Sequence, residues 1–378
     1  MQPLFPSSEG YNKAPADDEI EVTLIGPGFG ECVLVHVGEG HWIVVDSCVE
    51  AKSQTPAALR YLADINVCPS KVSHLIITHW DADHCKGIAE LAKACSKAKV
   101  VMSRAFVERD FLEFVQAHKK PLTRMARSGV GEIDHLLREL EKSGRTNIIA
   151  AQPDRRIHTW PASSIGHGQK CEIWTLAPSD FEYQNFLEWL ASQMPKVGET
   201  RRTAITRKRN NLSAVIYLRI GEDAILLGGD IEERNKPEAG WSAILASSGR
   251  PQNPASLFNL SHHGADSGDH PKVWSDMLSA KPWALISSFR NGSVSLPSSA
   301  DANRTLGYTE NAYVSTNLKS VANPPMDKRV SKTIKQVTKR YTTLSQKMGL
   351  IRARRLAKGS PNWEVSLHGN ASHLSHAR

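Results

Sequence analysis

Residues 73–90 read S-H-L-I-I-T-H-W-D-A-D-H-C-K-G-I-A-E, and we expect the fold to be organised around them. The apolar run at 75–77 predicts a buried strand, and Ile88, Leu91 and Ala92 follow at helical spacing. Open α/β sheets place their sites in loops that join the carboxyl end of a strand to a helix. Four side chains able to bind metal lie in this loop: His79, Asp81, Asp83 and His84. The stretch therefore predicts an α/β fold with a functional site at this loop.

The crowding of these four side chains points to a cation. Two carboxylates and two imidazoles between residues 79 and 84 would repel and desolvate one another unless something positive held them. The alternative is a set of ordinary polar loop residues with a satisfied histidine or two, but loops rarely contain such a group by chance. The pattern favours a metal site.

Two later segments carry further candidate ligands. Residues 210–232 predict a β-hairpin that turns at 221–223, and its second strand ends in Gly228-Gly229-Asp230. Because two glycines let the backbone approach closely, Asp230 is suited to bridge two metal ions. A short apolar run at 257–260 then leads into S-H-H-G, which contains His262 and His263.

In this order, the motifs resemble those of the metallo-β-lactamase superfamily. The sequence H-x-D-x-D-H at 79–84 is similar to its H-x-H-x-D-H signature, with Asp81 in place of the second histidine. It is most similar to the hydrolase domain of ComEC-type DNA-uptake channel proteins, whose D-V-G-Q-G-D-A, G-D-I-E and H-H-G-S pieces also have counterparts here. The resemblance covers residues 19–316 and implies a four-layer αββα fold. The chain's own pattern of apolar and basic residues adds two features to this prediction, a helical insertion and a basic C-terminal helix.

The resemblance also implies two divalent metal ions, Zn or Mn. One ion would be held by His79, Asp81 and Asp230, and the other by Asp83, His84, His263 and the shared Asp230. Because Asp81 supplies a carboxylate where the superfamily has an imidazole, the set favours harder ions such as Mn²⁺ without excluding Zn²⁺.

Catalytic and supporting roles follow from the same resemblance. Asp83 would orient or deprotonate the attacking water, and His262 would contact the transition state or support a ligand from behind. Asp46 ends a predicted strand and would brace the metal loop, although Asp also favours strand ends simply as a cap.

Two departures from the superfamily pattern weaken one ion site. A further histidine is expected before Asp230, and none of His118, His135, His158 and His167 follows a convincing strand; Asn211 or Ser213 would stand there instead. In addition, residues 296–298 read Leu-Pro-Ser where the ComEC-type group has His-Pro-Ser. We therefore expect one ion to be held weakly.

Length and composition bound the class of protein. The 378 residues are 23% charged and 40% hydrophobic, which is typical of a soluble globular protein of one large or two ordinary domains. No apolar run approaches the ~20 residues needed to span a bilayer, and the first residues lack the features of a signal peptide. Six cysteines without a Cys-x-x-Cys pair indicate reduced, buried thiols. We expect a cytoplasmic protein without the ComEC channel.

Charge and composition suggest a division of the chain. We expect a loosely held leader at 1–18, a hydrolase domain at 19–325 and a basic amphipathic helix with a closing segment at 326–378. Within the domain, a helical insertion is expected at about 103–165 and a basic loop at about 196–210. Eleven Lys or Arg and no acid lie between 328 and 358. Candidate nucleic-acid contacts are Arg201, Arg202, Arg207, Lys208, Arg209, Lys335, Lys339 and Arg340; a merely solvated basic surface is the alternative.

Three functions fit these observations. The first is a metal-dependent phosphodiesterase or nuclease that cleaves nucleic acid, DNA being favoured, through a hydroxide activated by two metal ions. The second is a hydrolase of small molecules such as cyclic nucleotides, esters or lactones, which the fold also permits. The third is a degenerate binding or sensing subunit of a larger bacterial complex. No membrane contact is expected, and the C-terminal helix is a possible seam for a homodimer or partner subunit.

Overall fold

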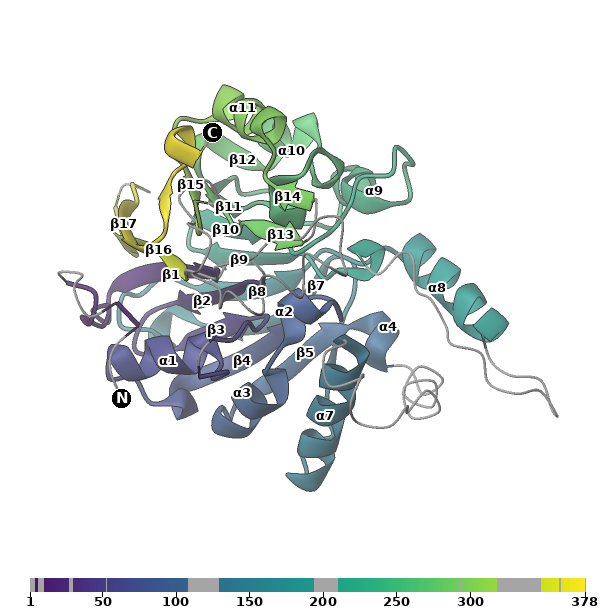
Figure 1. The fold of residues 1–378 in the computed structure, drawn as a ribbon, viewed down its shortest axis with the longest axis horizontal. Helices are drawn as coiled ribbons and strands as arrows, with labels where there is room; N and C mark the ends of the chain where they lie inside the picture. Colours follow the sequence, from purple (N-terminus) through teal and green to yellow (C-terminus); the bar gives the residue numbers. More distant parts are fainter. Residues whose placement is uncertain are drawn as a thin grey trace, which may run out of the picture.

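The fold is a sandwich of two sheets with helices on both outer faces (Figure 1). A computed structural model describes residues 4–5, 10–26, 30–51, 53–107, 129–193, 210–291, 294–317, 348–359 and 362–377. Within these ranges, two sheets of eight strands pack face to face, and a separate two-stranded hairpin lies beside the second sheet. This arrangement confirms the predicted α/β fold class with four αββα layers.

The first sheet has an antiparallel half and a parallel half. In spatial order its strands are β17 (Glu364–Gly369), β16 (Gly349–Leu356), β1 (Glu19–Gly26), β2 (Cys32–His36), β3 (Trp42–Val45), β4 (Val72–Ile77), β5 (Lys99–Ser103) and β6 (Ile149–Ala151). Pairing is antiparallel from β17 to β3 and parallel from β3 to β6. The helices that follow along this half of the chain are α1 (Ala57–Asp64), α2 (Ala82–Cys85), α3 (Ile88–Ala94), α4 (Arg104–Val107) and α7 (Gly129–Lys142).

The second sheet is arranged in the same mixed manner. Its order is β18 (Ser372–His373), β15 (Ala312–Val314), β12 (Leu278–Ile286), β11 (Ala255–Asn259), β10 (Asp223–Leu227), β9 (Ile216–Ile220), β8 (Cys171–Thr175) and β7 (Arg155–Trp160). Strands β10, β11, β12 and β15 are parallel neighbours. The remaining elements are α8 (Asp180–Gln193), α9 (Gly240–Ala246), α10 (Pro271–Asp276), α11 (Ser299–Tyr308) and the hairpin of β13 (Phe289–Asn291) and β14 (Val294–Leu296).

Apolar residues fill three layers because alternate side chains of a strand point to opposite faces. In β1, Ile20, Val22 and Leu24 face the space between the sheets, whereas Ile25 packs toward the helices of the first sheet. The parallel strands are apolar on both faces, as expected where helices cover one side and a second sheet the other. This packing gives the loops at the strand ends a rigid base.

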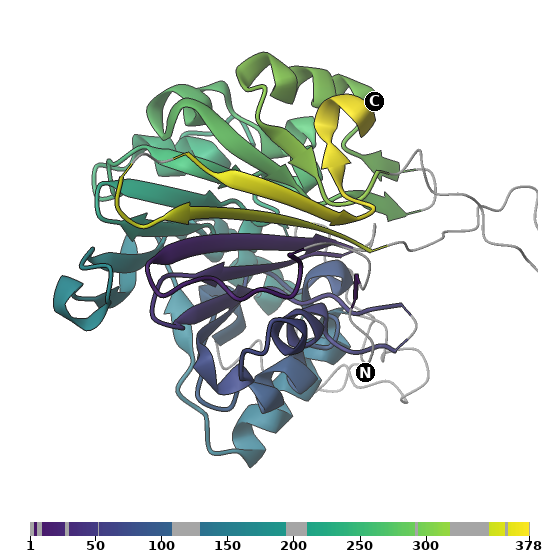
Figure 2. The ribbon, with the colours of Figure 1, turned by 90° about the vertical axis from the view of Figure 1, so that its left-hand side faces the viewer.

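The basic C-terminal run is in part a strand. We expected a helix that continues to Ile351, but residues 349–356 form β16, which lies between β17 and β1 (Figure 2). The arginines of β16 bind to other parts of the sandwich. Arg352 donates to the Tyr11 carbonyl at 2.8 Å, Arg354 pairs with Glu21 at 2.7 Å, and Arg355 pairs with Asp223 at 2.9 Å. The boundary expected at 325 therefore does not separate a second unit from the sandwich.

Other expected segments differ in detail. The insertion is helical at α4 and α7, but β6 and β7 within it are edge strands of the two sheets. Part of the expected leader packs on the body, because Tyr11 is 2% exposed and its hydroxyl donates to Asp64. All the candidate nucleic-acid contacts lie outside the described residues: Arg201, Arg202, Arg207, Lys208, Arg209, Lys335, Lys339 and Arg340. Among the described helices, none combines the length and apolar character that a bilayer crossing requires.

Candidate metal centre

The metal loop follows β4 as the sequence predicts, but part of it is helical. Strand β4 ends at Ile77, residues 78–81 form the loop, and Asp83 and His84, which we expected in the loop, lie in α2, which begins at Ala82. In the second sheet, Asp230 follows β10, and His263 lies in η4 (Ser261–Gly264) just after β11. Since β10 and β11 are parallel neighbours, their carboxyl ends lie at one edge, and both residues meet the metal loop there.

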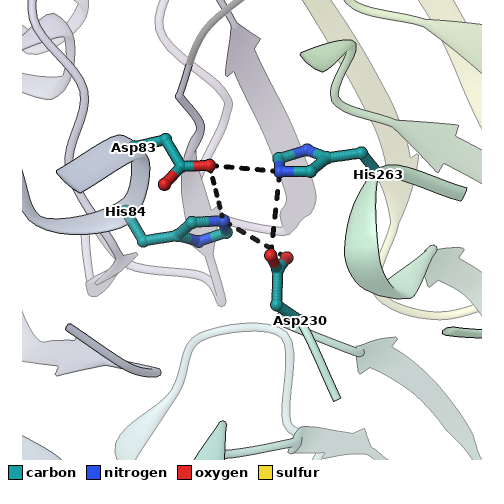
Figure 3. A group of neighbouring side chains, drawn as sticks. All are labelled: Asp83, His84, Asp230 and His263. Atoms are coloured by element: carbon teal, nitrogen blue, oxygen red, sulfur yellow. Dashed lines mark hydrogen bonds and ion pairs between the residues drawn. The ribbon is translucent and has the colours of Figure 1, made fainter. Parts of the chain in front are cut away.

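Four of the predicted ligands form one compact group. One ligand atom from each of Asp83, His84, Asp230 and His263 lies within 4.8 Å of the others (Figure 3). His84 Nε2 is 3.2 Å from Asp230 Oδ1, and His263 Nε2 is 3.3 Å from Asp83 Oδ2 and 3.8 Å from Asp230 Oδ2. Two carboxylates and two imidazoles at this spacing form a donor set suited to one divalent ion.

Unsatisfied polar atoms indicate that a cation fits this site. His79 Nε2, His84 Nε2 and Asp230 Oδ1 are buried without a hydrogen-bond partner. Buried polar groups are nearly always paired, so three orphaned atoms aimed at one region require an explanation. All three are ordinary ligand atoms for divalent metals, which would satisfy them together. Asp83, His84, Asp230 and His263 would hold one ion. A second cluster of potential ligand atoms among the described residues consists of Asp46, His79 and His84.

The charges in the group are strongly coupled. Burial works to lower the pKa of His84, but the carboxylates of Asp230 and Asp46 outweigh it and raise that pKa well above the ordinary value. Burial alone would raise the pKa of Asp230, yet the imidazoles of His84 and His263 hold it well below its usual range. Opposite charges thus stabilise one another where neither would be stable alone.

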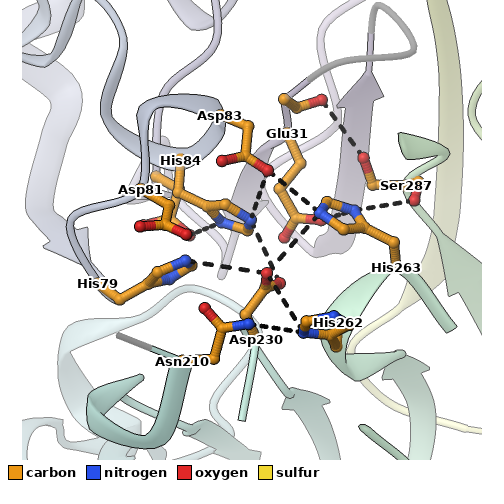
Figure 4. A network of polar contacts seen from close by, with 12 residues as sticks. Glu31, His79, Asp81, Asp83, His84, Asn210, Asp230, His262, His263 and Ser287 are labelled. Atoms are coloured by element: carbon orange, nitrogen blue, oxygen red, sulfur yellow. Dashed lines mark hydrogen bonds and ion pairs between the residues drawn. The ribbon is translucent and has the colours of Figure 1, made fainter. Parts of the chain in front are cut away.

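His79 lies at the edge of this group. Its Nε2 is 3.8 Å from Asp230 Oδ2, and the ring points toward Asp230 (Figure 4). Burial lowers the pKa of His79, and the nearby His84 lowers it further. Asp81 begins α2 and is absent from both clusters of potential ligand atoms found among the described residues. Of the ligands expected for the first ion, the structure brings His79 and Asp230 together but does not add Asp81 to them.

Asp46 supports the metal loop from behind. One carboxylate oxygen accepts from the Thr78 backbone N–H at 2.8 Å, and the other accepts from the Thr78 hydroxyl and lies 2.8 Å from His84 Nδ1. A hydrogen bond to Nδ1 leaves Nε2 of His84 directed at the ligand group. Asp46 also has a left-handed backbone, with φ of 59°. These contacts agree with the bracing role expected for Asp46.

The position of the absent third histidine is taken by polar residues of η3 (Asn210–Leu212) and the residue after it. Ser213 Oγ accepts from the backbone N–H of Asp230 at 3.0 Å, and Asn211 is buried. The other histidines considered lie elsewhere: the His158 ring packs against His74, His167 Nε2 contacts the Val37 carbonyl, and His135 is exposed on α7, while His118 is outside the described residues. Ser213 therefore holds the backbone of Asp230 at the position where the superfamily pattern has a further histidine.

The structure adds three residues that sequence reasoning missed. Glu31 is buried, accepts from Asn259 at 3.3 Å and lies 3.9 Å from His263 Nδ1; burial raises its pKa to about 7. Asn210 contacts both Glu232 and His262 (Figure 4). Glu31 is the acidic residue of the G-x-G-E segment, so the resemblance to the superfamily could have identified it. Asn210 and Glu232 belong to no spaced motif that would have marked them in the sequence.

The His-His-Gly turn has an unusual backbone. His262, His263 and Gly264 all have positive φ, at 49°, 56° and 76°. Left-handed non-glycine residues cost on the order of 1 kcal/mol each and persist where neighbours fix them. Arg304 of α11 provides such a neighbour, since it donates to the Gly264 carbonyl at 2.8 Å and pairs with Asp269 at 2.8 Å.

Sequence comparison identifies the family. A model of the metallo-β-lactamase superfamily matches residues 25–268, a range that includes the metal loop, Asp230 and the His-His-Gly turn. This chain belongs to that superfamily. Superfamily members are generally metal-dependent hydrolases, and the grouped His and Asp side chains fit the divalent ions, typically zinc, that such enzymes use. No curated protein matched the sequence.

Three solved structures illustrate how distantly this chain resembles proteins of known structure. A metallo-β-lactamase from Cronobacter sakazakii is 12% identical over 68% of this chain and 69% of its own, with a TM-score of 0.29. A metallo-β-lactamase from Staphylococcus aureus is 12% identical over 57% of this chain and 44% of its own, with a TM-score of 0.30. A flavo di-iron protein from Thermotoga maritima is 12% identical over 57% of this chain and 37% of its own, with a TM-score of 0.26. Similarity this low does not indicate which substrates this chain acts on.

Proposed function

We propose that this superfamily hydrolase is a ComEC-type phosphodiesterase that cleaves nucleic acid, with DNA as the favoured substrate. The observation that carries the proposal is the compact group of Asp83, His84, Asp230 and His263, whose orphaned atoms suit divalent metal. A divalent cation there would neutralise charge on a phosphodiester and make an attacking water more acidic. The carboxylate-rich H-x-D-x-D-H loop supports the ComEC-type assignment, and hard oxygen ligands suit Mn²⁺ as well as Zn²⁺.

The chain's own residues supply the rest of the chemistry. Asp83 is 11% exposed at its side chain and lies at the open side of the group, where it can orient a water for in-line attack. Asp46 and Ser213 hold His84 and Asp230 in place. The complete four-residue group argues against the degenerate binding subunit, which would be expected to have lost ligands. The basic residues proposed for backbone contacts remain Arg201, Arg202, Arg207, Lys208, Arg209, Lys335, Lys339 and Arg340.

A small-molecule hydrolase is the second candidate, and one observation favours it. Glu232 is 34% exposed at its side chain and lies 3.5 Å from His262, so it places negative charge at the open side of the centre. A polyanion that approached from this side would be repelled strongly, a cyclic nucleotide with its single negative charge would be repelled less, and a neutral ester or lactone would not be repelled.

A cleavage assay separates the candidates. Full-length protein loaded with Mn²⁺ or Zn²⁺ is incubated with linear DNA, circular DNA, a cyclic nucleotide and a lactone, in parallel with His79→Ala and Asp230→Ala. Cleavage of DNA that both substitutions reduce supports the proposal. Turnover confined to the small substrates supports the second candidate. DNA cleavage that survives both substitutions would come from a contaminant, and a metal-loaded protein inactive on all four substrates would overturn both.

A further inference from the structure

Among the described residues, the side chain nearest to His262 Nδ1 is Asn210 of η3. Asn210 Nδ2 lies 2.8 Å from His262 Nδ1 and also 2.8 Å from Glu232 Oε1. The carboxylates near His262 Nδ1 are farther away, with Glu232 Oε1 at 3.5 Å and Asp230 Oδ2 at 3.7 Å (Figure 4). Hydrogen bonds of this kind have lengths of about 2.7–3.2 Å. Within the described part of the chain, Asn210 is therefore the only side chain that lies within hydrogen-bonding distance of His262 Nδ1.

The position of the hydrogens follows from which groups can donate. An ionised carboxylate only accepts, so the Asn210 atom that faces Glu232 must be the amide nitrogen; an amide oxygen there would be repelled. The same NH₂ group directs its second hydrogen at His262 Nδ1, which must then offer a lone pair. In a neutral imidazole with Nδ1 as acceptor, the proton lies on Nε2.

The backbone holds this imidazole at the open side of the centre. The backbone N–H of His262 donates to the Gly229 carbonyl at 2.9 Å, next to Asp230, and its φ of 49° is left-handed. The side chain is 21% exposed, whereas that of His263 is 2% exposed. Among the described residues, no hydrogen bond or ion pair involves Nε2 of His262. An N–H donor on Nε2 is thus left without a protein partner on a partly exposed side chain, whose other ring nitrogen lies 3.7 Å from Asp230 Oδ2.

We propose that Asn210 and Glu232 hold His262 as the Nε2–H tautomer, so that His262 donates a hydrogen bond to a phosphoryl oxygen of the substrate. The inference rests on the proposed phosphodiesterase function and assigns one residue a role in it. A fixed donor aimed at an oxygen that gains negative charge stabilises the transition state. His262 is then a substrate contact, and Asn210 and Glu232 are positioning residues. It also follows that His262 does not replace the absent third histidine as a ligand, because Asn210 occupies its Nδ1 lone pair.

Histidine ¹⁵N NMR of the Zn²⁺-loaded full chain tests the tautomer directly. We expect Nε2–H for His262. Asn210→Asp replaces the donor with an acceptor of the same size and should convert His262 to a form protonated at Nδ1. Glu232→Gln keeps an oxygen that accepts from Asn210, so this matched control should retain Nε2–H. A wild-type Nδ1–H tautomer, or an Asn210→Asp spectrum identical to wild type, would overturn the proposal.

Calorimetry with inorganic phosphate and Zn²⁺-loaded protein gives a readout independent of turnover. His262→Ala and Asn210→Asp should each weaken phosphate binding by about 10-fold or more, the value of one hydrogen bond to a charged group. Zinc content should stay at the wild-type level in both variants, and Glu232→Gln should bind phosphate as wild type does. Unchanged phosphate affinity, or loss of zinc from His262→Ala, contradicts the proposal. If DNA is not cleaved but these results hold, the substrate assignment fails and the role of His262 stands.

Discussion

Two groups of histidines occupy opposite ends of β4 and behave differently. At the carboxyl end, His79 and His84 face Asp230. At the start of the strand, His74 packs against His158 with ring centroids 4.7 Å apart and ring planes tilted by 46°. The two ends are separated by about 16 Å, at 3.3 Å per residue. We call the second set, His41, His74 and His158 around Trp160, the distal histidine group.

Carboxylates, not orphaned nitrogens, distinguish the two groups. His74 Nε2 is buried without a hydrogen-bond partner, as is His84 Nε2. Burial and the neighbouring His158 lower the pKa of His74 to about 3, whereas Asp230 and Asp46 overcome burial and raise the pKa of His84. No potential metal cluster of three or more residues includes His74 among the described residues. In the described part of this chain, the group of histidines that also contains carboxylates is the one whose ligand atoms converge as a potential metal site.

The largest effect is expected from the bridging carboxylate. Asp230→Asn keeps the size of the side chain but removes the charge that both imidazoles face. Substitution of a residue that only supports a ligand lowers metal affinity by about 10- to 100-fold, so loss of this ligand charge should lower it by more than about 100-fold. Zinc titration followed by elemental analysis measures it. Wild-type metal content in this variant would show that the centre is not built around Asp230.

Matched alanine substitutions in the two histidine groups compare them directly. His84→Ala should lose most bound zinc, because one of four grouped ligands is gone. His74→Ala should bind zinc as wild type does and should instead lower the melting temperature, because a buried ring leaves a cavity. Elemental analysis and thermal unfolding of both variants distinguish the outcomes. Equal zinc loss from both would remove the distinction between the groups.

Asp46→Asn examines the support behind His84. The amide is a poorer acceptor for His84 Nδ1–H and for Thr78, so zinc affinity should fall by about 10- to 100-fold. Asp223→Asn is the control, since Asp223 makes similar bonds to Ser256 far from the metal centre. Competition with a zinc chelator measures both affinities. A loss in the control as large as in Asp46→Asn would mean that general destabilisation, not bracing, is responsible.

The smallest effect concerns the distal histidine group and pH. In the unfolded chain His74 has its ordinary pKa of 6.5, whereas in the folded chain its pKa is about 3. The unfolded state thus binds more protons in this interval, so stability falls as pH falls, by about 1 kcal/mol between pH 7 and 5.5. Urea unfolding of metal-free protein measures it against His74→Leu, which should lack this contribution. Identical pH dependence in the two proteins would contradict the shifted pKa.

Local patterns predicted the strand before the metal loop and the strands that lead to the later ligands. Strands β4, β9, β10 and β11 follow from their apolar runs and from the turn residues at 221–223, and the four donors of residues 79–84 stand together in the sequence. β16 escaped prediction because its arginines suggested a solvated helix, and their acidic partners, such as Glu21, are far away in the chain. Asn210 escaped because a single amide has no spacing that marks it. Contacts between distant residues decide such cases.

The position of β16 has a consequence for biosynthesis. A ribosome releases β1 early, but the strand that covers one of its edges is residues 349–356, so residues 27–348 must be made in between. During that interval β1 has unpaired N–H and C=O groups along one edge, and these groups can form hydrogen bonds with strands of other chains. Nascent protein arrested before this strand should therefore need a chaperone at that edge, even when its metal loop is already complete.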